Sequence, residues 1–131
     1  MVNNAFIFLG GSYMTGEVHI PSCVAFGQGL SKGSVGVPES ITIQTQDMFG
    51  NLVQASQPLT FVLQLQQGAA YHYFYASRTS AFHYKGSFLL FDPGQYNLSI
   101  NVGDVSIYGS PFNLEISEGM YFNIFLQSRF Y

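Results

Sequence analysis

Charged side chains are scarce in this chain of 131 residues. It has four lysines and arginines and seven aspartates and glutamates, which together make up 8% of the sequence, whereas an ordinary soluble domain carries about 25%. The polar surface must therefore come from uncharged side chains. The net charge is −3, and four basic residues are too few to neutralise the phosphates of a nucleic acid. The composition therefore argues against a nucleic-acid partner.

Cysteine and long apolar runs are also missing. Cys23 is the only cysteine, so the chain can form neither an internal disulfide nor a cluster of thiolate metal ligands. The apolar runs are short, as in residues 5–9, whereas a membrane-spanning helix needs about 20 residues. We therefore expect no membrane insertion by this segment.

Residues for catalysis or metal binding do not occur in usable patterns. His19, His72 and His83 form no His-x-His or His-x3-His pair, and the carboxylates lie elsewhere in the sequence. The glycine-rich segment 27–33 lacks the Gly-Lys-Ser/Thr order of a phosphate-binding loop. No nucleophile elbow and no suitable pair of carboxylates is found. We expect no enzymatic activity, no cofactor and no metal site.

Two-residue alternation of apolar and polar side chains recurs along the chain, whereas helical spacing free of Gly or Pro is absent. About seven short strands separated by Gly, Pro and Asp turns predict an all-β fold, an immunoglobulin-like sandwich of two antiparallel sheets. The clearest alternation covers residues 41–46, 59–66, 96–102 and 112–117, and less regular strands fit residues 23–26, 82–85 and 87–90.

One tyrosine favours the sandwich over a barrel. Tyr96 stands two residues after Gly94, at the start of a strand that follows the turn at residues 92–94. At such a corner a tyrosine buries its ring and ties its hydroxyl back to the backbone, as in immunoglobulin-like sandwiches. The alternative is an ordinary core tyrosine near a strand start.

Three sequence blocks resemble one known family. The first, residues 23–38, has a Gly-x-Gly-Leu turn and a glycine-punctuated crossing to the next strand; the second, residues 41–51, ends in Phe-Gly-Asn. The third, residues 94–112, has the corner tyrosine and ends in Gly-Ser-Pro-Phe. Residues 21–117 thus resemble a filamin-type immunoglobulin repeat, the module named for the actin-crosslinking filamins. The aromatic run at residues 71–75 and the low charge depart from the cytoskeletal members of the family.

The resemblance implies a non-enzymatic module that binds a partner protein by strand addition at an exposed sheet edge. By position in the family, the strand at 59–66 and the segment at 71–75 would frame the groove. The aromatic run at residues 71–75 is expected to be either an exposed contact surface or an extra strand and ordinary core. The residues expected to bind the partner are Leu59, Phe61, Val62, Leu63, Gln64, Tyr71, Tyr73 and Tyr75.

Asn97-Leu98-Ser99 is an N-glycosylation sequon, and the alternation turns Asn97 and Ser99 outward. Together with the scarcity of charge, it slightly favours an extracellular or cell-surface location over the cytoplasmic cytoskeleton. The expected function is protein interaction or adhesion by one repeat of a larger protein that has tandem neighbours. The alternatives are a cytoskeletal, actin-crosslinking scaffold repeat and, less favoured, a sandwich that binds a glycan or another small ligand through Tyr71, Tyr73 and Tyr75.

The resemblance divides the chain into three parts. Residues 1–20 are an N-terminal extension or the end of a preceding module, residues 21–117 the filamin-type domain, and residues 118–131 an aromatic C-terminal extension. The last part is expected to pack on the sandwich, contact a neighbour or begin another domain; its aromatic residues are Tyr121, Phe122, Phe125, Phe130 and Tyr131.

Overall fold

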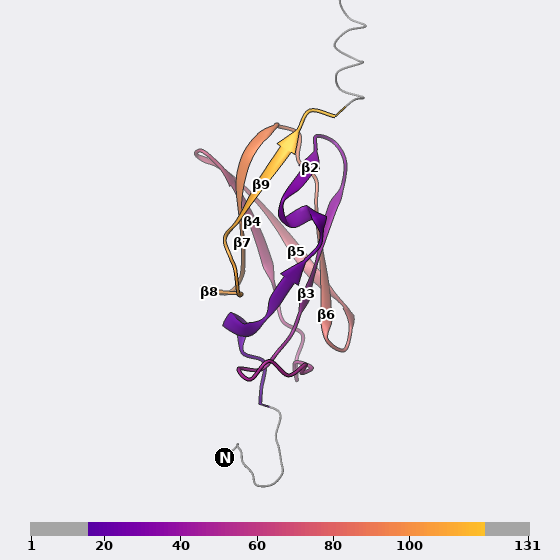
Figure 1. The fold of residues 1–131 in the computed structure, drawn as a ribbon, viewed down its shortest axis with the longest axis vertical. Helices are drawn as coiled ribbons and strands as arrows, with labels where there is room; N and C mark the ends of the chain where they lie inside the picture. The colour runs from indigo at the N-terminus through magenta and orange to yellow at the C-terminus, as the bar shows by residue number, and fades with distance from the viewer. Residues whose placement is uncertain (1–15, 120–131) are drawn as a thin grey trace, which may run out of the picture.

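The structure, a computed structural model, describes residues 16–119 (Figure 1). Strands make up most of its regular structure, and the two helices are single 3-10 turns, η1 (Ile20–Ser22) and η2 (Gln28–Leu30). The expected all-β class is confirmed. The strands are β1 (Val24–Phe26), β2 (Lys32–Ser34), β3 (Glu39–Gln44), β4 (Val62–Gln67), β5 (Ala70–Ser80), β6 (His83–Phe88), β7 (Gly94–Val102), β8 (Val105–Ser106) and β9 (Phe112–Ser117).

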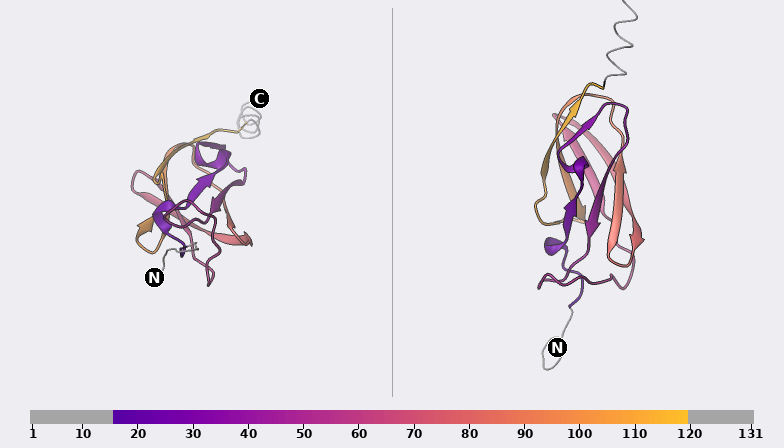
Figure 2. Two further views of the ribbon diagram at one scale, coloured as in Figure 1. Left: turned by 60° about the horizontal axis from the view of Figure 1, so that its bottom comes forward. Right: turned by 45° about the vertical axis from the view of Figure 1, so that its right-hand side comes forward.

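The strands form one hydrogen-bonded path that curls into two layers. Its order is β1-β3-β6-β5-β4-β7-β9-β2, and β8 pairs with β7. β5 joins the layers, because residues 70–75 pair with β4 and residues from 76 onward pair with β6. All pairs are antiparallel except β2 with β9. Figures 1 and 2 show the resulting elongated sandwich, with the described chain entering at one end and leaving at the other.

The core lies between the two layers and is made by alternate residues of their strands. Ile41 and Ile43 of β3 and Leu63 and Leu65 of β4 are fully or almost fully buried. The layers approach closely at Gly86, where the Cβ of any other residue would lie 2.8 Å from Leu63 Cδ2. The rings of Phe61 and Tyr84 meet edge to face across the same interior at 4.9 Å. Burial of this apolar surface is the main stabilising contribution to the fold.

Two tyrosine hydroxyls tie loops to the sandwich. The buried Tyr96 donates a hydrogen bond from its hydroxyl to the Asp92 carbonyl oxygen at 2.6 Å. The tyrosine corner expected at this position is therefore present. The buried Tyr84 hydroxyl accepts a hydrogen bond from the Leu59 backbone N–H at 2.9 Å.

The strand count and two strand boundaries differ from the expectation. Nine strands are present because β5 is a full strand of 11 residues and because the short β2 and β8 also pair. The two strands expected at 82–85 and 87–90 are one strand, β6, because Gly86 fits against Leu63 without a break. β4 begins at Val62 rather than at Leu59, whose N–H bonds a tyrosine hydroxyl instead.

The packed structure already includes residues before Pro21. Gly16 N–H donates to Asp47 Oδ2 at 3.0 Å, and His19 N–H donates to the Gln46 carbonyl oxygen at 2.8 Å. Val18 and Ile20 pack against the core. The predictions for residues 1–15 and for the aromatic run from Tyr121 to Tyr131 lie outside the described residues. No helix in the described part of the chain is long and apolar enough to cross a membrane.

Candidate binding surface on β4 and β5

The first half of β5 has a free backbone edge. Ala76 N–H donates to the Phe61 carbonyl oxygen at 3.0 Å, so Ala76 points its backbone groups toward β4. Because these groups alternate in direction along a strand, those of Tyr71, Tyr73 and Tyr75 point away from β4. On that side β6 pairs from Ala76 onward, and the pairing of Ala76 with Gly86 uses the carbonyl of Tyr75, so Tyr71 and Tyr73 are the residues that no described strand pairs there. We call the backbone groups of Tyr71 and Tyr73 the β5 edge.

β4 itself has no free edge, so of the two segments expected to frame the groove only the one at 71–75 offers one. It pairs with β5 along one side and with β7 along the other. The reason is the unexpected length of β5, which covers the side of β4 that would otherwise be open. Of the expected partner-binding residues, Phe61 and Leu63 are in the core. Leu59 packs partly buried against the core, and Val62 and Gln64 are half-buried on the outer face.

The side chains of Tyr71, Tyr73 and Tyr75 project from the outer face of β5. They are 48%, 55% and 63% exposed, whereas the intervening His72 and Phe74 point inward and are half-buried. The rings of Tyr71 and Tyr73 lie 6.5 Å apart, and their planes are within 11° of parallel. The run is thus both a strand and an exposed surface.

The tyrosines continue into rows of uncharged polar side chains on the neighbouring strands. Tyr71 lies opposite Gln66 of β4, which lies opposite Asn97 of β7, which lies opposite Asn113 of β9. We call the whole surface the tyrosine–amide face. Its residues are Tyr71, Tyr73, Tyr75, Val62, Gln64, Gln66, Asn97, Ser99, Asn101 and Asn113.

A shallow hollow of about 300 Å³ lies at one end of this face. Gln66, Gln95, Asn97 and Asn113 line it, with Gly68 and Tyr96 completing its wall. Asn97, the residue of the sequon, is exposed there, and Ser99 is half-exposed. The hollow therefore adjoins Tyr71 and is lined largely by side-chain amides, groups that both donate and accept hydrogen bonds.

Comparison with known proteins identifies the family. The model of the Filamin/ABP280 repeat family matches residues 17–113. The chain belongs to the filamin repeat family. Among solved structures, the crystal structure of the Lin-41 filamin domain is similar, with a TM-score of 0.64 and 18% identity over 77% of this chain and 97% of that chain. This likeness shows the fold. No curated protein matches the chain.

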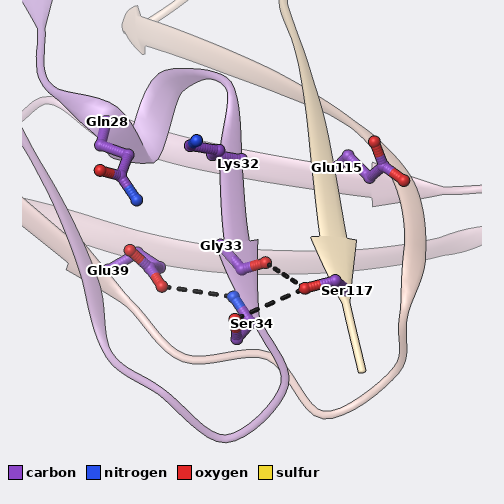
Figure 3. A pocket seen from close by; sticks show the side chains of 7 residues that line it. All are labelled: Gln28, Lys32, Gly33, Ser34, Glu39, Glu115 and Ser117. Atoms are coloured by element: carbon purple, nitrogen blue, oxygen red, sulfur yellow. Dashed lines mark hydrogen bonds between the residues drawn. The ribbon is translucent and has the colours of Figure 1, made fainter. Parts of the chain in front are cut away.

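A second polar hollow of this filamin repeat, of about 420 Å³, lies between β2 and β9 (Figure 3). Its polar groups are used to hold these two strands. Ser34 N–H donates to Glu39 Oε2 at 3.3 Å, and Ser117 Oγ donates to the Gly33 carbonyl oxygen at 3.3 Å. A Cβ at Gly33 would lie 2.7 Å from Glu39 Cγ, so a larger residue here would have to displace the Glu39 side chain. These contacts explain the hollow as part of the fold.

The repeat shows little potential for chemistry. The buried Cys23 thiol has a raised pKa because burial disfavours its thiolate, although the backbone hydrogen bond of Gln46 partly opposes this. A protonated, buried thiol is a poor nucleophile. Residues 16–119 contain no group of three or more His, Cys, Asp or Glu side chains that could hold a metal ion. The filamin repeat family is one of structural and interaction domains.

The sequence analysis named both 59–66 and 71–75 for the groove and did not decide which of them has the free edge. A signal was available, since Tyr71, Tyr73 and Tyr75 alternate with His72 and Phe74 in a two-residue period directly after a Gly-Ala turn. That pattern is typical of a strand with one exposed and one inward face.

Proposed function

We propose that this filamin repeat binds a partner protein by adding one extended partner segment to the β5 edge. The observation that supports this most directly is the ladder geometry: two residues of a well-formed strand, Tyr71 and Tyr73, direct their backbone groups to a side that no described residue pairs. A free strand edge is a template for another strand. In strand addition the main chain supplies the affinity, and alternate side chains supply the selectivity.

The surroundings of the edge suit a segment of alternating apolar and polar residues. On the inner side, the half-buried Phe74 lies 6.3 Å, between ring centroids, from the buried Phe88. Apolar side chains of the added strand would cover this pair. On the outer side the added strand would lie beside Tyr73 and Tyr75, so uncharged polar residues fit there. A charged segment would find no described ion-pair partner among the residues of the tyrosine–amide face.

The substitution Tyr73→Pro tests the edge. Proline removes the outward N–H of residue 73 and projects its ring from the edge, but it breaks no bond to β4, and edge strands tolerate it. The matched control is Tyr73→Ala, which removes the side chain and keeps the N–H. The probe is a displayed library of random peptides about 12 residues long, long enough to span the edge as a strand.

We expect the selected peptides to alternate apolar and polar residues, to bind the wild-type repeat and Tyr73→Ala, and to lose binding to a folded Tyr73→Pro. In hydrogen exchange, bound peptide should slow the exchange of the amides of Tyr71 and Tyr73. Peptides that protect other strands, or that bind folded Tyr73→Pro as well as wild type, would show that the β5 edge is not the site.

The same proposal includes a role in adhesion at the cell surface, with a cytoskeletal scaffold as the alternative. The low charge and the exposed sequon at Asn97 support the extracellular setting. The entry and exit of the chain at opposite ends of the sandwich support tandem neighbours in line (Figure 1).

Glycosylation of Asn97 in the native protein tests the extracellular location. When the native full-length protein is isolated from its own cells, we expect a glycan on Asn97 that peptide-N-glycosidase removes. The variant Ser99→Ala, which destroys the sequon at a half-exposed position, should lack it. An unmodified Asn97 in the native protein would favour the cytoskeletal alternative and leave the proposal for the β5 edge intact.

A further inference from the structure

The tyrosine–amide face has a composition that neither core packing nor strand addition explains. The β5 edge uses backbone groups, whereas this face presents side chains, and it extends across β4 and β7 as far as Asn113 of β9. Its residues carry no carboxylate, ammonium, guanidinium or imidazole group, and the exposed carboxylate of Glu115, which lies opposite Gln95 and two residues after Asn113, borders the face at β9. Hydrogen bonds within residues 16–119 leave the side-chain amides of Gln64, Asn97 and Asn113 unused.

We infer that the tyrosine–amide face binds a neutral oligosaccharide. The tyrosine rings offer flat apolar surfaces with a polar tip, suited to the C–H faces of sugar rings. The neighbouring amides both donate and accept hydrogen bonds, as sugar hydroxyls do. The absence of charge among the residues of the face matches a ligand without charge.

The amides distinguish this ligand from an apolar one. A lipid or an apolar protein surface laid on the face would cover Gln64, Gln66 and Asn97 without giving them hydrogen-bond partners, and buried polar groups without partners are costly. A ligand with many hydroxyls replaces the water that these amides lose. The chemistry of the face therefore selects a hydroxyl-rich ligand over an apolar partner.

The dimensions of the face fit a chain of several sugars. The row from Tyr71 through Gln66 and Asn97 to Asn113 crosses four strands, which at about 4.8 Å per strand spacing spans about 14 Å. The shallow hollow of about 300 Å³ beside Asn97 and Asn113 gives one ring of the chain a recessed position. The rows lie on a hydrogen-bonded sheet, so the backbone positions from which the side chains project are fixed before the ligand arrives.

The inference concerns the repeat with an unmodified Asn97, because a glycan on Asn97 would itself occupy the hollow. The test therefore uses the repeat produced in bacteria, in which Asn97 carries no glycan. The probes are cellohexaose, chitohexaose and mannohexaose, each added at up to about 10 mM, which covers the range of weak sites. Binding is followed by the NMR signals of the side-chain amides. We expect at least one probe to shift the signals of Gln64, Gln66, Asn97 and Asn113.

Substitutions then locate the site. Tyr73→Ala should weaken binding at least about tenfold, and Tyr73→Phe, which keeps the ring, should bind nearly as wild type does. The matched control is Tyr108→Ala, since Tyr108 is 69% exposed and belongs to no row of the face; it should leave binding unchanged. Tyr75→Ala provides a second variant should Tyr73→Ala fail to fold.

Three outcomes would overturn the inference. In the first, none of the three probes shifts the amide signals. In the second, Tyr108→Ala weakens binding as much as Tyr73→Ala does. In the third, the amide signals respond to protein concentration alone while sedimentation shows a dimer, which would assign the face to a second copy of the chain. The test is independent of the proposed function, because Tyr73→Ala removes the oligosaccharide and keeps the β5 edge.

Discussion

β4 and β5 are neighbours in one hydrogen-bonded sheet and are joined by a tight turn, yet the molecule uses them in opposite ways. β4 is paired along both edges and sends Leu63 and Leu65, both fully buried, into the core. β5 leaves one edge of its first half free and exposes Tyr71, Tyr73 and Tyr75. The two adjacent strands thus differ in role: β4 stabilises the fold, and β5 presents groups to other molecules.

The largest expected loss of stability follows from the removal of a core side chain from β4. Leu63→Ala should lower the free energy of unfolding by about 3 kcal/mol, because it loses buried apolar surface and opens a cavity against Gly86. The measurement is urea unfolding followed by circular dichroism. The matched β5 variant, Tyr73→Ala, should stay within about 0.5 kcal/mol of wild type. Equal losses in the two variants would abolish the distinction between the strands.

A buried polar group extends the comparison beyond apolar residues. Asp47, which is fully buried after β3, accepts hydrogen bonds from the backbone N–H groups of Gly16, Phe49 and Asn51 and from Asn51 Nδ2. Asp47→Ala would leave these donors without their partner and should cost about 2 kcal/mol in urea unfolding. A loss as small as that of Tyr73→Ala would mean that water replaces the carboxylate.

Asp47 also makes the stability depend on pH. Burial raises the pKa of its carboxyl, but the hydrogen bonds from Gly16, Asn51 and Phe49 outweigh this, so the pKa lies below its ordinary value. This contribution is therefore complete above the unfolded value of about 3.9 and is lost as the pH falls through the lower folded pKa. The advantage of wild type over Asp47→Asn in thermal unfolding should shrink below about pH 4. An advantage that is constant from pH 6 to about pH 2 would contradict this assignment.

The hydroxyl groups of two tyrosines in the same sheet should contribute differently to stability, by a smaller amount. Tyr96→Phe removes the hydroxyl that donates to the Asp92 carbonyl oxygen from a buried ring and should cost about 1 kcal/mol. Tyr73→Phe removes a hydroxyl from an exposed ring and should change nothing measurable. Chemical denaturation of both variants makes the comparison, and a cost for Tyr73→Phe similar to that of Tyr96→Phe would show that the hydroxyl of Tyr73 has a structural role.

The sequence predicted the buried residues of the strands better than it predicted the free strand edge. Alternation alone placed Leu98 and Leu114 inside, where they are fully buried, and the position of Tyr96 predicted its corner. These features depend on local pattern and burial. The sequence did not decide which of the two segments expected to frame the groove has the free edge, because this depends on how far the long-range pairing of β4 with β5 extends, and side-chain alternation does not predict that length.

The smallest expected effect concerns the tyrosine at the point where β5 passes from one layer to the other. Tyr75 is 63% exposed and lies opposite Val62, one residue before the pairing with β6 begins. Tyr75→Thr keeps a residue that favours strands and should change the free energy of unfolding by less than about 0.5 kcal/mol. Thermal unfolding of wild type and Tyr75→Thr measures the difference. A loss above about 1 kcal/mol would mean that the exposed ring holds the two layers in register, and the tyrosines would then serve the fold as β4 does.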